Sequence, residues 1–144
     1  MTEIVMNQAL YDTVVEQLKR HEGLRLKPYR CTAGKLSIGY GRNLESNGIT
    51  LKEAEIMLDY DIACCIKDLK AMFKDFETLP EPIQIVLCNM RYNLGYNGLI
   101  EFKKMLTACQ ARNWKEMAKQ MQKSSWYLQV GGRATELVKM VEDV

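Results

Sequence analysis

The chain has 144 residues, which is the usual size of one domain built around a single hydrophobic core. Hydrophobic residues make up 47% of it and charged residues 26%, as in ordinary globular proteins, and it has no apolar run of about eighteen residues that would predict a membrane span. The net charge of +2 is too weak to indicate a nucleic-acid-binding surface, because Lys and Arg are spread among Asp and Glu.

The first predicted element is a helix from about Asn7 to His21. Its apolar residues recur at helical spacing, so one stripe of the helix is expected to be buried. The next position on that stripe is Glu22, and Gly23 after it is typical of a helix stop. The residues of the stripe are Tyr11, Val15 and Leu18.

The segment from Leu24 to Ile49 predicts a small antiparallel sheet. Short runs of strand-forming residues alternate there with glycines, and turns are expected at Thr32–Lys35 and near Asn47–Gly48. The sequence from Thr50 to Glu53 is a capping box, which predicts the start of a second helix that runs to about Phe73. Its apolar stripe is expected at Ala54, Leu58, Ile62, Cys65, Leu69 and Met72.

The rest of the chain predicts a group of shorter helices. Two prolines at positions 80 and 82 break the chain after the long helix. A loop is expected around Ser124 to Gly132. The order of helix, small sheet, long helix and further helices indicates an α+β fold that is mostly helical. The later helices are expected at 82–93, 99–110, 113–121 and 133–142.

The five cysteines are an odd number, so they cannot all pair within one chain. Residues 1–18 lack a basic head followed by an apolar stretch, so no signal peptide is expected and the thiols indicate synthesis in a reducing cytosol. His21 is the only histidine and no Cys-x-x-Cys motif occurs, so no metal site is expected. Four thiols are expected to pack between helices: Cys64, Cys65, Cys88 and Cys109.

Glu22 is unusual on physical grounds alone. It continues the apolar stripe of the first helix and stands at the C-terminal end of that helix. Burial and the negative end of the helix dipole both disfavour a charged carboxylate, so both favour an acid that can still donate a proton near neutral pH. General acid catalysis needs such a group. The alternative is a glutamate in water at a frayed helix end.

The segment from His21 to Tyr29 resembles the opening signature of phage-type lysozymes. In that family a glutamate is followed by eight residues, an Asp or Cys, five residues and a Thr. Here Glu22 is followed at these spacings by Cys31 and Ser37, and Ser37 departs from the usual threonine. Further segments resemble the family in the same order, over about residues 9–144 in all: Ser37–Gly41, Asn47–Thr50, Asn89–Gly95 and Ser125–Gln129.

This resemblance implies a lysozyme-like fold in one domain over residues 1–144. A small antiparallel sheet lobe is expected over about 23–50. A helical lobe is expected over about 1–22 and 74–144, and the helix over about 51–73 is expected to join the two lobes.

The resemblance also implies roles for individual residues. Glu22 is the expected catalytic acid. Cys31 stands where many relatives have an aspartate, so its thiol or thiolate is a candidate nucleophile, base or water-positioning group. Ser37 is expected to hold the attacking water through its hydroxyl. The alternative for Cys31 is a small packing residue in a hairpin.

The same resemblance implies three candidate substrate-binding residues in the second half of the chain. Tyr92 and Asn93 are expected to contact saccharide, and Arg133 is expected to pair with Glu22 across the cleft. The alternative for Arg133 is a solvated side chain on the last helix. No cofactor is implied.

Three further side chains have structural expectations. Arg42 and Asp61 are expected to form a salt bridge, because many relatives pair a His with an Asp at these positions; the alternative is two solvated charges. Trp126 is expected to belong to the core, together with Tyr127, rather than to form a sugar platform.

The implied function is that of an endolysin, which hydrolyses the β-1,4 bond between N-acetylmuramic acid and N-acetylglucosamine in bacterial peptidoglycan and so lyses the host cell. Two alternatives stay open. A lytic transglycosylase also uses a lone glutamate but forms an anhydro product. A catalytically impaired lysozyme-like domain would only bind peptidoglycan, and the departures at Cys31 and Ser37 keep that alternative open.

Peptidoglycan is the expected partner, and neither nucleic-acid binding nor stable membrane insertion is expected. Without a signal peptide, the protein is expected to accumulate as a monomer in the host bacterial cytoplasm. It would then reach the periplasm or cell wall at lysis, after a separate protein has opened the membrane.

Overall fold

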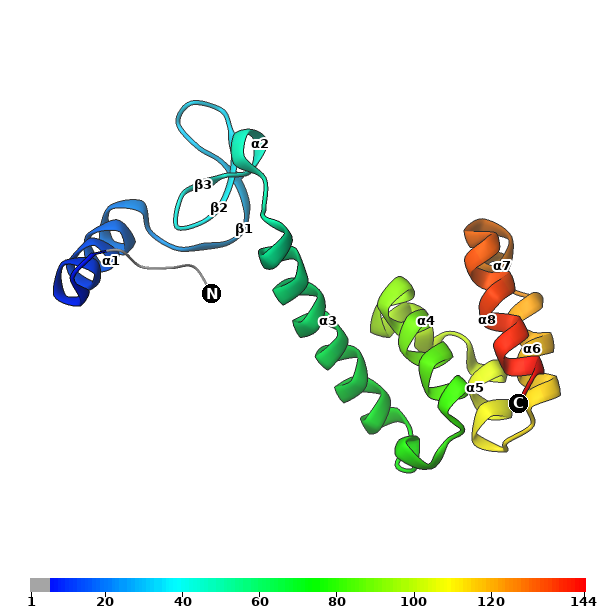
Figure 1. Cartoon of the computed structure of the whole chain (residues 1–144). Coiled ribbons are helices and arrows are strands. Elements are labelled where there is room, and N and C mark those ends of the chain that lie inside the picture. Colours follow the sequence, from blue (N-terminus) through cyan, green and yellow to red (C-terminus); the bar gives the residue numbers. More distant parts are fainter. Residues whose placement is uncertain (1–5) are drawn as a thin grey trace. The chain divides into compact units, whose positions relative to one another are not determined.

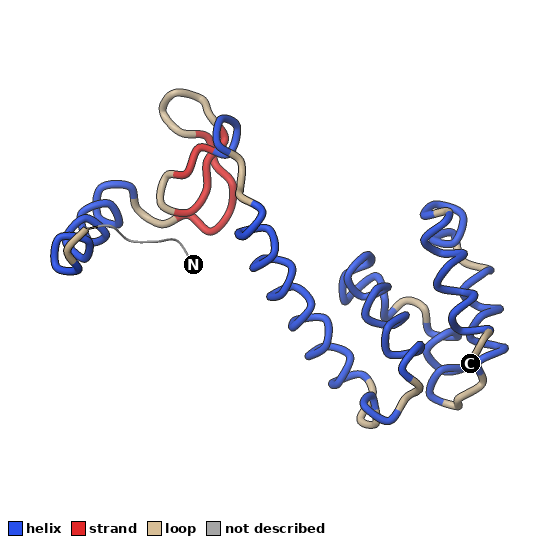
Figure 2. Tube along the Cα trace, in the orientation of Figure 1, coloured by secondary structure: helices blue, strands red, loops and turns tan. Residues whose placement is uncertain are grey.

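The structure is a computed structural model that describes residues 6–144. Helices account for most of these residues, and the strands form one three-stranded antiparallel sheet in the order β1-β2-β3 (Figures 1 and 2). This confirms the predicted α+β class. The described residues form two compact units, one that ends at Ala54 and one over residues 55–144. The lobes expected from sequence, in which the first helix joins the C-terminal helices, stay a prediction.

The first unit begins with α1 (Gln8–Glu22), within one residue of the predicted helix. The side chain of Asn7 caps it by accepting a hydrogen bond from the N–H of Ala9 (2.8 Å). Gly23 ends it with φ 71°, and its N–H donates to the carbonyl of Lys19. The helix buries none of its side chains, and Leu18 is 50% exposed, so the expected buried stripe is not observed.

The sheet of the first unit consists of β1 (Arg25–Arg30), β2 (Leu36–Gly39) and β3 (Arg42–Asn43). The predicted turn between β1 and β2 is confirmed, because the N–H of Cys31 donates to the carbonyl of Lys35 and the N–H of Gly34 donates to the carbonyl of Cys31. The register places Tyr29 opposite Ser37.

A short helix, α2 (Leu44–Asn47), follows the sheet where only a turn was predicted. The Glu45 carboxylate of this helix contacts the sheet in two ways. It accepts a hydrogen bond from the backbone N–H of Leu36 (3.0 Å), and it forms an ion pair with Arg30. This tie explains why the segment after β3 is ordered as a helix turn.

The long helix α3 (Leu51–Met72) begins in the first unit and continues into the second. The predicted capping box is confirmed: the N–H of Glu53 donates to the hydroxyl of Thr50 (3.1 Å), and the N–H of Thr50 donates to the carboxylate of Glu53 (2.9 Å). Only the C-terminal part of the expected stripe is buried. Leu69 is fully buried, whereas Leu58 is 42% exposed.

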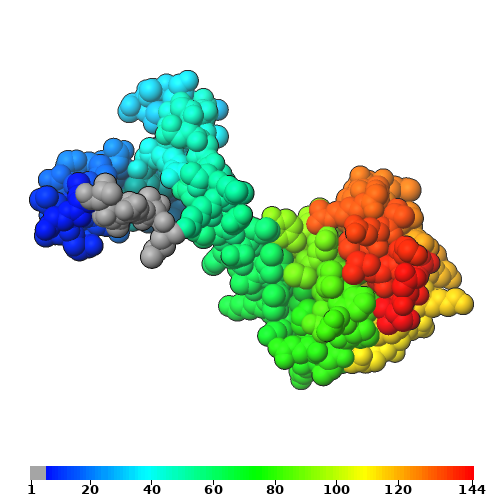
Figure 3. All heavy atoms as spheres, in the orientation of Figure 1, coloured from blue at the N-terminus to red at the C-terminus, as the bar shows by residue number. Residues whose placement is uncertain are grey.

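The second unit packs its helices around one core. Figure 3 shows the surface of this unit, from green to red. The predicted loop over 124–132 is wrong, because a short helix forms there; Ser124 caps it by accepting from the N–H of Tyr127, and Trp126 is buried in the core. Gly95 has φ 76° and interrupts the fourth helix. After α3 the elements are η1 (Phe76–Thr78), α4 (Glu81–Ile100), α5 (Lys103–Gln110), α6 (Trp114–Gln122), α7 (Ser125–Val130) and α8 (Gly132–Glu142).

The core of the second unit is made of aliphatic side chains and methionines. Apolar spacing along α4 places fully buried residues on one face of that helix, against side chains of α3, α5, α6 and α8. Among residues 6–144, no helix has the length and apolar character needed to cross a bilayer. The fully buried side chains of α4 are Ile83, Val86, Leu87, Met90 and Leu99.

Truncation of this core should destabilise the protein strongly. Leu87 is fully buried, so we expect Leu87→Ala to lower the free energy of unfolding by about 2–5 kcal/mol through lost burial and a residual cavity. Leu128 is 81% exposed, and Leu128→Ala should change that free energy by less than about 0.5 kcal/mol. Urea denaturation followed by circular dichroism measures both, and equal losses in the two variants would contradict this core.

Candidate functional site

Glu22 is the last residue of α1, and its carboxylate lies against the backbone of Gly41. Gly41 sits in the turn between β2 and β3 with φ 76°. A Cβ atom at that position would lie 2.3 Å from the Glu22 Oε2 atom, so a larger residue would make the Glu22 carboxylate move, and the positive φ itself favours glycine. The turn between β2 and β3 and the end of α1 therefore meet at this acid.

The surroundings of Glu22 differ from the expectation. The Glu22 side chain is exposed rather than buried, like the other side chains at this end of α1. A cation–π contact beside the glutamate links the helix end to the sheet. The Lys19 ammonium lies over the ring of Tyr40, 5.5 Å from the ring centroid, and Tyr40 is the residue before Gly41. Contact with the turn, rather than burial on an apolar stripe, is what distinguishes Glu22.

Cys31 and Ser37 are brought together at the turn between β1 and β2. The Cys31 thiol is half-buried, and its pKa lies below the usual value because the backbone N–H groups of Lys35 and Ala33 bond to it, with a smaller contribution from the Ser37 hydroxyl. Ser37 is only 2% exposed, and its hydroxyl donates to the carbonyl of Lys35 (3.2 Å). This turn thus stabilises a thiolate beside a hydroxyl.

Arg42 pairs with Glu53, whereas Asp61 was the expected partner. The Arg42 Nη1 atom lies 2.6 Å from the Glu53 Oε1 atom, and it also approaches the carbonyl of Gly48 (3.4 Å). The Arg42 guanidinium, followed by the hydrogen bonds from Thr50, lowers the pKa of Glu53 to about 2. One carboxylate therefore ties β3 to the first turn of α3 and completes the capping box.

The second unit holds a groove between α3, α4 and α8. The groove has a volume of about 370 Å³, and the exposed ring of Tyr92 lines it. Arg133 lies in the same groove, where its Nε atom donates to the Asn89 side-chain oxygen (2.8 Å) and its Nη2 atom donates to the Asn89 carbonyl (3.2 Å). The expected pairing of Arg133 with Glu22 stays a prediction, because Glu22 belongs to the other unit.

Asn93 has a structural partner that the sequence did not indicate. Its side-chain oxygen accepts a hydrogen bond from the indole N–H of Trp126 (2.8 Å). Trp126 is 4% exposed and packs in the core, as predicted, with Tyr127 partly buried beside it. The Asn93 side chain is itself exposed, so its amide nitrogen is free to donate to a ligand.

Three of the remaining cysteines, Cys65, Cys88 and Cys109, pack among the helices as predicted, whereas the prediction for Cys64 stays a prediction. Burial is the largest influence on three of them and raises the pKa of Cys65, Cys88 and Cys109, the last to about 12. Cys64 is half-buried. Within residues 6–144, no group of three or more His, Cys, Asp or Glu side chains is placed to hold a metal ion.

Two residues of this arrangement escaped the sequence analysis. Gly41 was noted as part of a glycine-rich, family-like segment but was given no role, although a glycine two residues after Gly39 signals a tight turn. Asn89, which orients Arg133, lies within a segment that resembles the lysozyme family but was given no role there. Both act through backbone or side-chain contacts between elements far apart in sequence.

The chain is similar to several known proteins. The family model for phage lysozyme matches residues 19–140. The chain is 30% identical to the pre-baseplate central spike protein Gp5 of Enterobacteria phage T4, covering 90% of this chain but only 27% of the spike protein. It is 24% identical to probable T4-type lysozyme 1 of Dictyostelium discoideum, covering 92% and 95% of the two chains. It is 37% identical to the endolysin of Acyrthosiphon pisum secondary endosymbiont phage 1, over 54% of each chain.

The Arg42–Glu53 pair should make the free energy of unfolding depend on pH in the acidic range. Because the folded pKa of Glu53 is lowered to about 2 from 4.5, its contribution to stability is complete above about pH 5 and is lost as the pH falls toward 2. Glu53→Gln should flatten this part of the profile of unfolding free energy against pH. Arg42→Gln should flatten it too, and the double variant should add little; full additivity would mean that the pair does not interact.

Cys31 should react with a small alkylating reagent before the buried thiols. Its pKa is lowered and its side chain is half-buried, whereas burial raises the pKa of Cys109 to about 12. Peptide mass spectrometry over a time course with iodoacetamide at neutral pH should show modification at Cys31 first, and Cys31→Ser should lack this early phase. Modification of Cys65 or Cys109 ahead of Cys31 would contradict the described turn.

Proposed function

The chain belongs to the phage lysozyme family, and from this premise we propose that it hydrolyses the β-1,4 bond between N-acetylmuramic acid and N-acetylglucosamine in bacterial peptidoglycan. A lysozyme-like action on peptidoglycan follows from the family itself. The choice of bond and of hydrolysis rests on the residues of the first unit. The contact of the Glu22 carboxylate with Gly41 is the observation that carries the proposal.

Glu22 is the proton donor in this proposal. Its exposed carboxyl group protonates the glycosidic oxygen as the bond from that oxygen to the sugar carbon breaks, and positive charge develops on the ring. The Gly41 backbone restricts where the carboxyl group can go, and Lys19 against Tyr40 keeps the helix end on the sheet. Such restraint matters because general acid catalysis depends on hydrogen-bond reach to the leaving oxygen.

The turn that holds Cys31 and Ser37 is the proposed site of water activation. Hydrogen bonds in the turn lower the pKa of the Cys31 thiol, and in this proposal its thiolate form accepts a proton as water attacks the cationic sugar carbon. The new carbon–oxygen bond gives a product with an added water, and the two protons end on the leaving oxygen and on the thiol. Whichever acceptor its hydroxyl hydrogen faces, the Ser37 oxygen keeps lone pairs that can accept a hydrogen bond from this water.

Two polar side chains at this turn favour hydrolysis over transglycosylation, which needs no directed water. They also argue against an impaired domain, since a lowered thiol pKa gives Cys31 part of the character of the carboxylate that many relatives have there.

The proposed biological role is that of an endolysin, which lyses the host cell from within. The similarity to a lysozyme of nearly equal length and to a phage endolysin supports it. In this role the protein acts as a monomer, waits in the host cytoplasm, and depends on another protein that opens the membrane. The match to part of a phage spike protein supports a second mode of delivery, in which the same chemistry is carried on a phage particle.

Loss of the acid should abolish activity without disturbing the fold. Glu22→Gln keeps the shape but removes the acidic proton, so we expect clearing of chloroform-treated bacterial cells to slow by about 10²–10⁴-fold. Glu16→Gln, on the same helix, should clear cells at the rate of the unaltered protein. Clearing by Glu22→Gln at nearly that rate would overturn the assignment of Glu22.

Gly41 should be required for activity in a way that Gly39 is not. Both have positive φ (76° and 70°), so Gly41→Ala and Gly39→Ala carry similar backbone strain. Only at Gly41 does the added Cβ meet the Glu22 carboxylate, whereas nothing lies within 4 Å at Gly39. We therefore expect similar losses of stability but a much lower kcat for Gly41→Ala alone. Equal kcat in the two variants would mean that the contact does not position the acid.

A further inference from the structure

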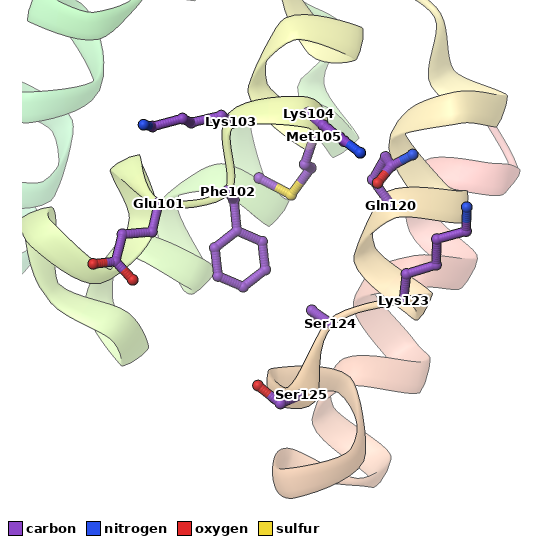
Figure 4. A pocket seen from close by; sticks show the side chains of 9 residues that line it. All are labelled: Glu101, Phe102, Lys103, Lys104, Met105, Gln120, Lys123, Ser124 and Ser125. Atoms are coloured by element: carbon purple, nitrogen blue, oxygen red, sulfur yellow. The ribbon is translucent and has the colours of Figure 1, made fainter.

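Basic side chains have different surroundings in the two units. Residues 101–123 of the second unit contain six basic and two acidic side chains and therefore carry +4. Three of the six, Lys103, Lys104 and Lys123, line a pocket of about 450 Å³ between α5 and α6 (Figure 4), and none of the three forms a salt bridge with another described residue. In the first unit, by contrast, the guanidinium of Arg30 contacts both a carbonyl and a carboxylate.

Arg30 and Glu45 hold two consecutive peptide groups of the turn between β1 and β2. The Arg30 Nη1 atom donates to the carbonyl of Gly34 (3.0 Å) and to the carboxylate of Glu45. The same Glu45 oxygen accepts a hydrogen bond from the backbone N–H of Leu36 (3.0 Å). Arg30 therefore holds the peptide group between Gly34 and Lys35, and Glu45 holds the next one, between Lys35 and Leu36.

The opposite ends of the same two peptide groups contact the proposed site residues. The N–H of Lys35, in the first peptide group, bonds to the Cys31 thiol and is the largest influence that lowers the pKa of this thiol. The carbonyl of Lys35, in the second, accepts a hydrogen bond from the Cys31 N–H (2.9 Å) and lies within hydrogen-bond distance of the Ser37 hydroxyl (3.2 Å). Each peptide group thus links the Arg30–Glu45 pair to a residue of the site.

The physics of a peptide group makes this link specific. The group is planar and trans, so a partner that fixes the direction of its carbonyl also fixes the direction of its N–H. Hydrogen bonds at its two ends polarise each other, and they do so more strongly where one partner is ionised. The guanidinium on the Gly34 carbonyl therefore strengthens the bond from the Lys35 N–H to the Cys31 sulfur. In the same way, the Glu45 carboxylate on the Leu36 N–H makes the Lys35 carbonyl a better acceptor.

We propose that Arg30 and Glu45 are positioning residues, which orient Cys31 and Ser37 toward the attacking water through these two peptide groups. This rests on the proposed function, in which the turn activates that water. Both residues act through the main chain and need no contact with substrate. Their side chains are 65% and 37% exposed, and an ion pair this exposed contributes little to stability by itself. Its effect should therefore appear in the chemistry of the thiol.

The pH dependence of Cys31 alkylation tests this without any substrate. Peptide mass spectrometry gives the rate at which iodoacetamide modifies Cys31 at each pH. Arg30→Gln should move the midpoint of this profile upward, and the rate at neutral pH should fall about three- to tenfold because less of the thiol is ionised. Arg42→Gln removes the other ion pair of the sheet, whose hydrogen bonds lie outside this turn, and should change the rate by less than about twofold.

Two conservative variants separate position from charge. Glu45→Gln keeps an oxygen that can accept from the Leu36 N–H but removes the charge, so the midpoint should move in the same direction by a smaller amount. Arg30→Lys can still donate to the Gly34 carbonyl and pair with Glu45, so it should restore most of the parent profile. Circular dichroism reports the fold of each variant, and these two keep the test in force if Arg30→Gln does not fold.

Turnover of purified peptidoglycan gives a second measurement. Arg30→Gln should lower kcat by about tenfold and change KM by less than about twofold, whereas Arg42→Gln should change both by less than about twofold. An unchanged alkylation midpoint in Arg30→Gln would overturn the proposal. So would faster alkylation at every pH, which indicates only an opened turn, or equal losses of kcat in the two variants. Hydrolysis by the parent protein and its loss in Glu22→Gln judge the proposed function separately, since alkylation involves no substrate.

Discussion

The carboxylate of Glu22 rests on the backbone of Gly41, and the geometry of the first unit follows from that contact. The helix must end at this residue, so Gly23 turns the chain away. The turn between β2 and β3 must bring a backbone without a side chain against the helix end, so glycine at positive φ stands there. The proposed catalytic acid therefore lies against main chain, and no ion pair with its carboxylate is present among the described residues.

Two ion pairs tie the sheet of this unit to the helices that follow it. Arg30 and Glu45 tie β1 to α2, and the Glu45 carboxylate also bonds to the N–H of Leu36. Arg42 and Glu53 tie β3 to α3. Each carboxylate also satisfies a backbone N–H, so these pairs order the chain locally as well as linking elements. Two carboxylates of the first unit thus have structural partners, whereas the Glu22 carboxylate is the one proposed to carry out chemistry.

Much of this fold was predictable because its signals are local. Asn7 before α1, Gly23 after it, and the Thr50–Glu53 capping box each act within a few residues, and the structure confirms all three. Helix α7 was missed because it has only six residues, too few for a clear apolar period, and it forms around the buried Trp126.

The site was predictable only in part, for a physical reason. Family spacing predicts Glu22, Cys31 and Ser37 as site residues, and these roles stay predictions; a spacing does not show that a Cβ atom at Gly41 would meet the Glu22 carboxylate. Likewise, the net charge of +2 for the whole chain does not show that residues 101–123 alone carry +4. Contacts and charge fields depend on which distant segments meet, and a linear pattern does not contain that information.

Mass spectrometry of the products released from purified peptidoglycan tests the central claim most directly. If Glu22 protonates the leaving oxygen while water attacks from the turn of Cys31 and Ser37, the fragments should end in reducing N-acetylmuramic acid, each heavier by one water than an anhydro end. Glu22→Gln should release none of them. Predominantly anhydro-muramic ends, or cleavage that survives Glu22→Gln, would contradict hydrolysis by this site.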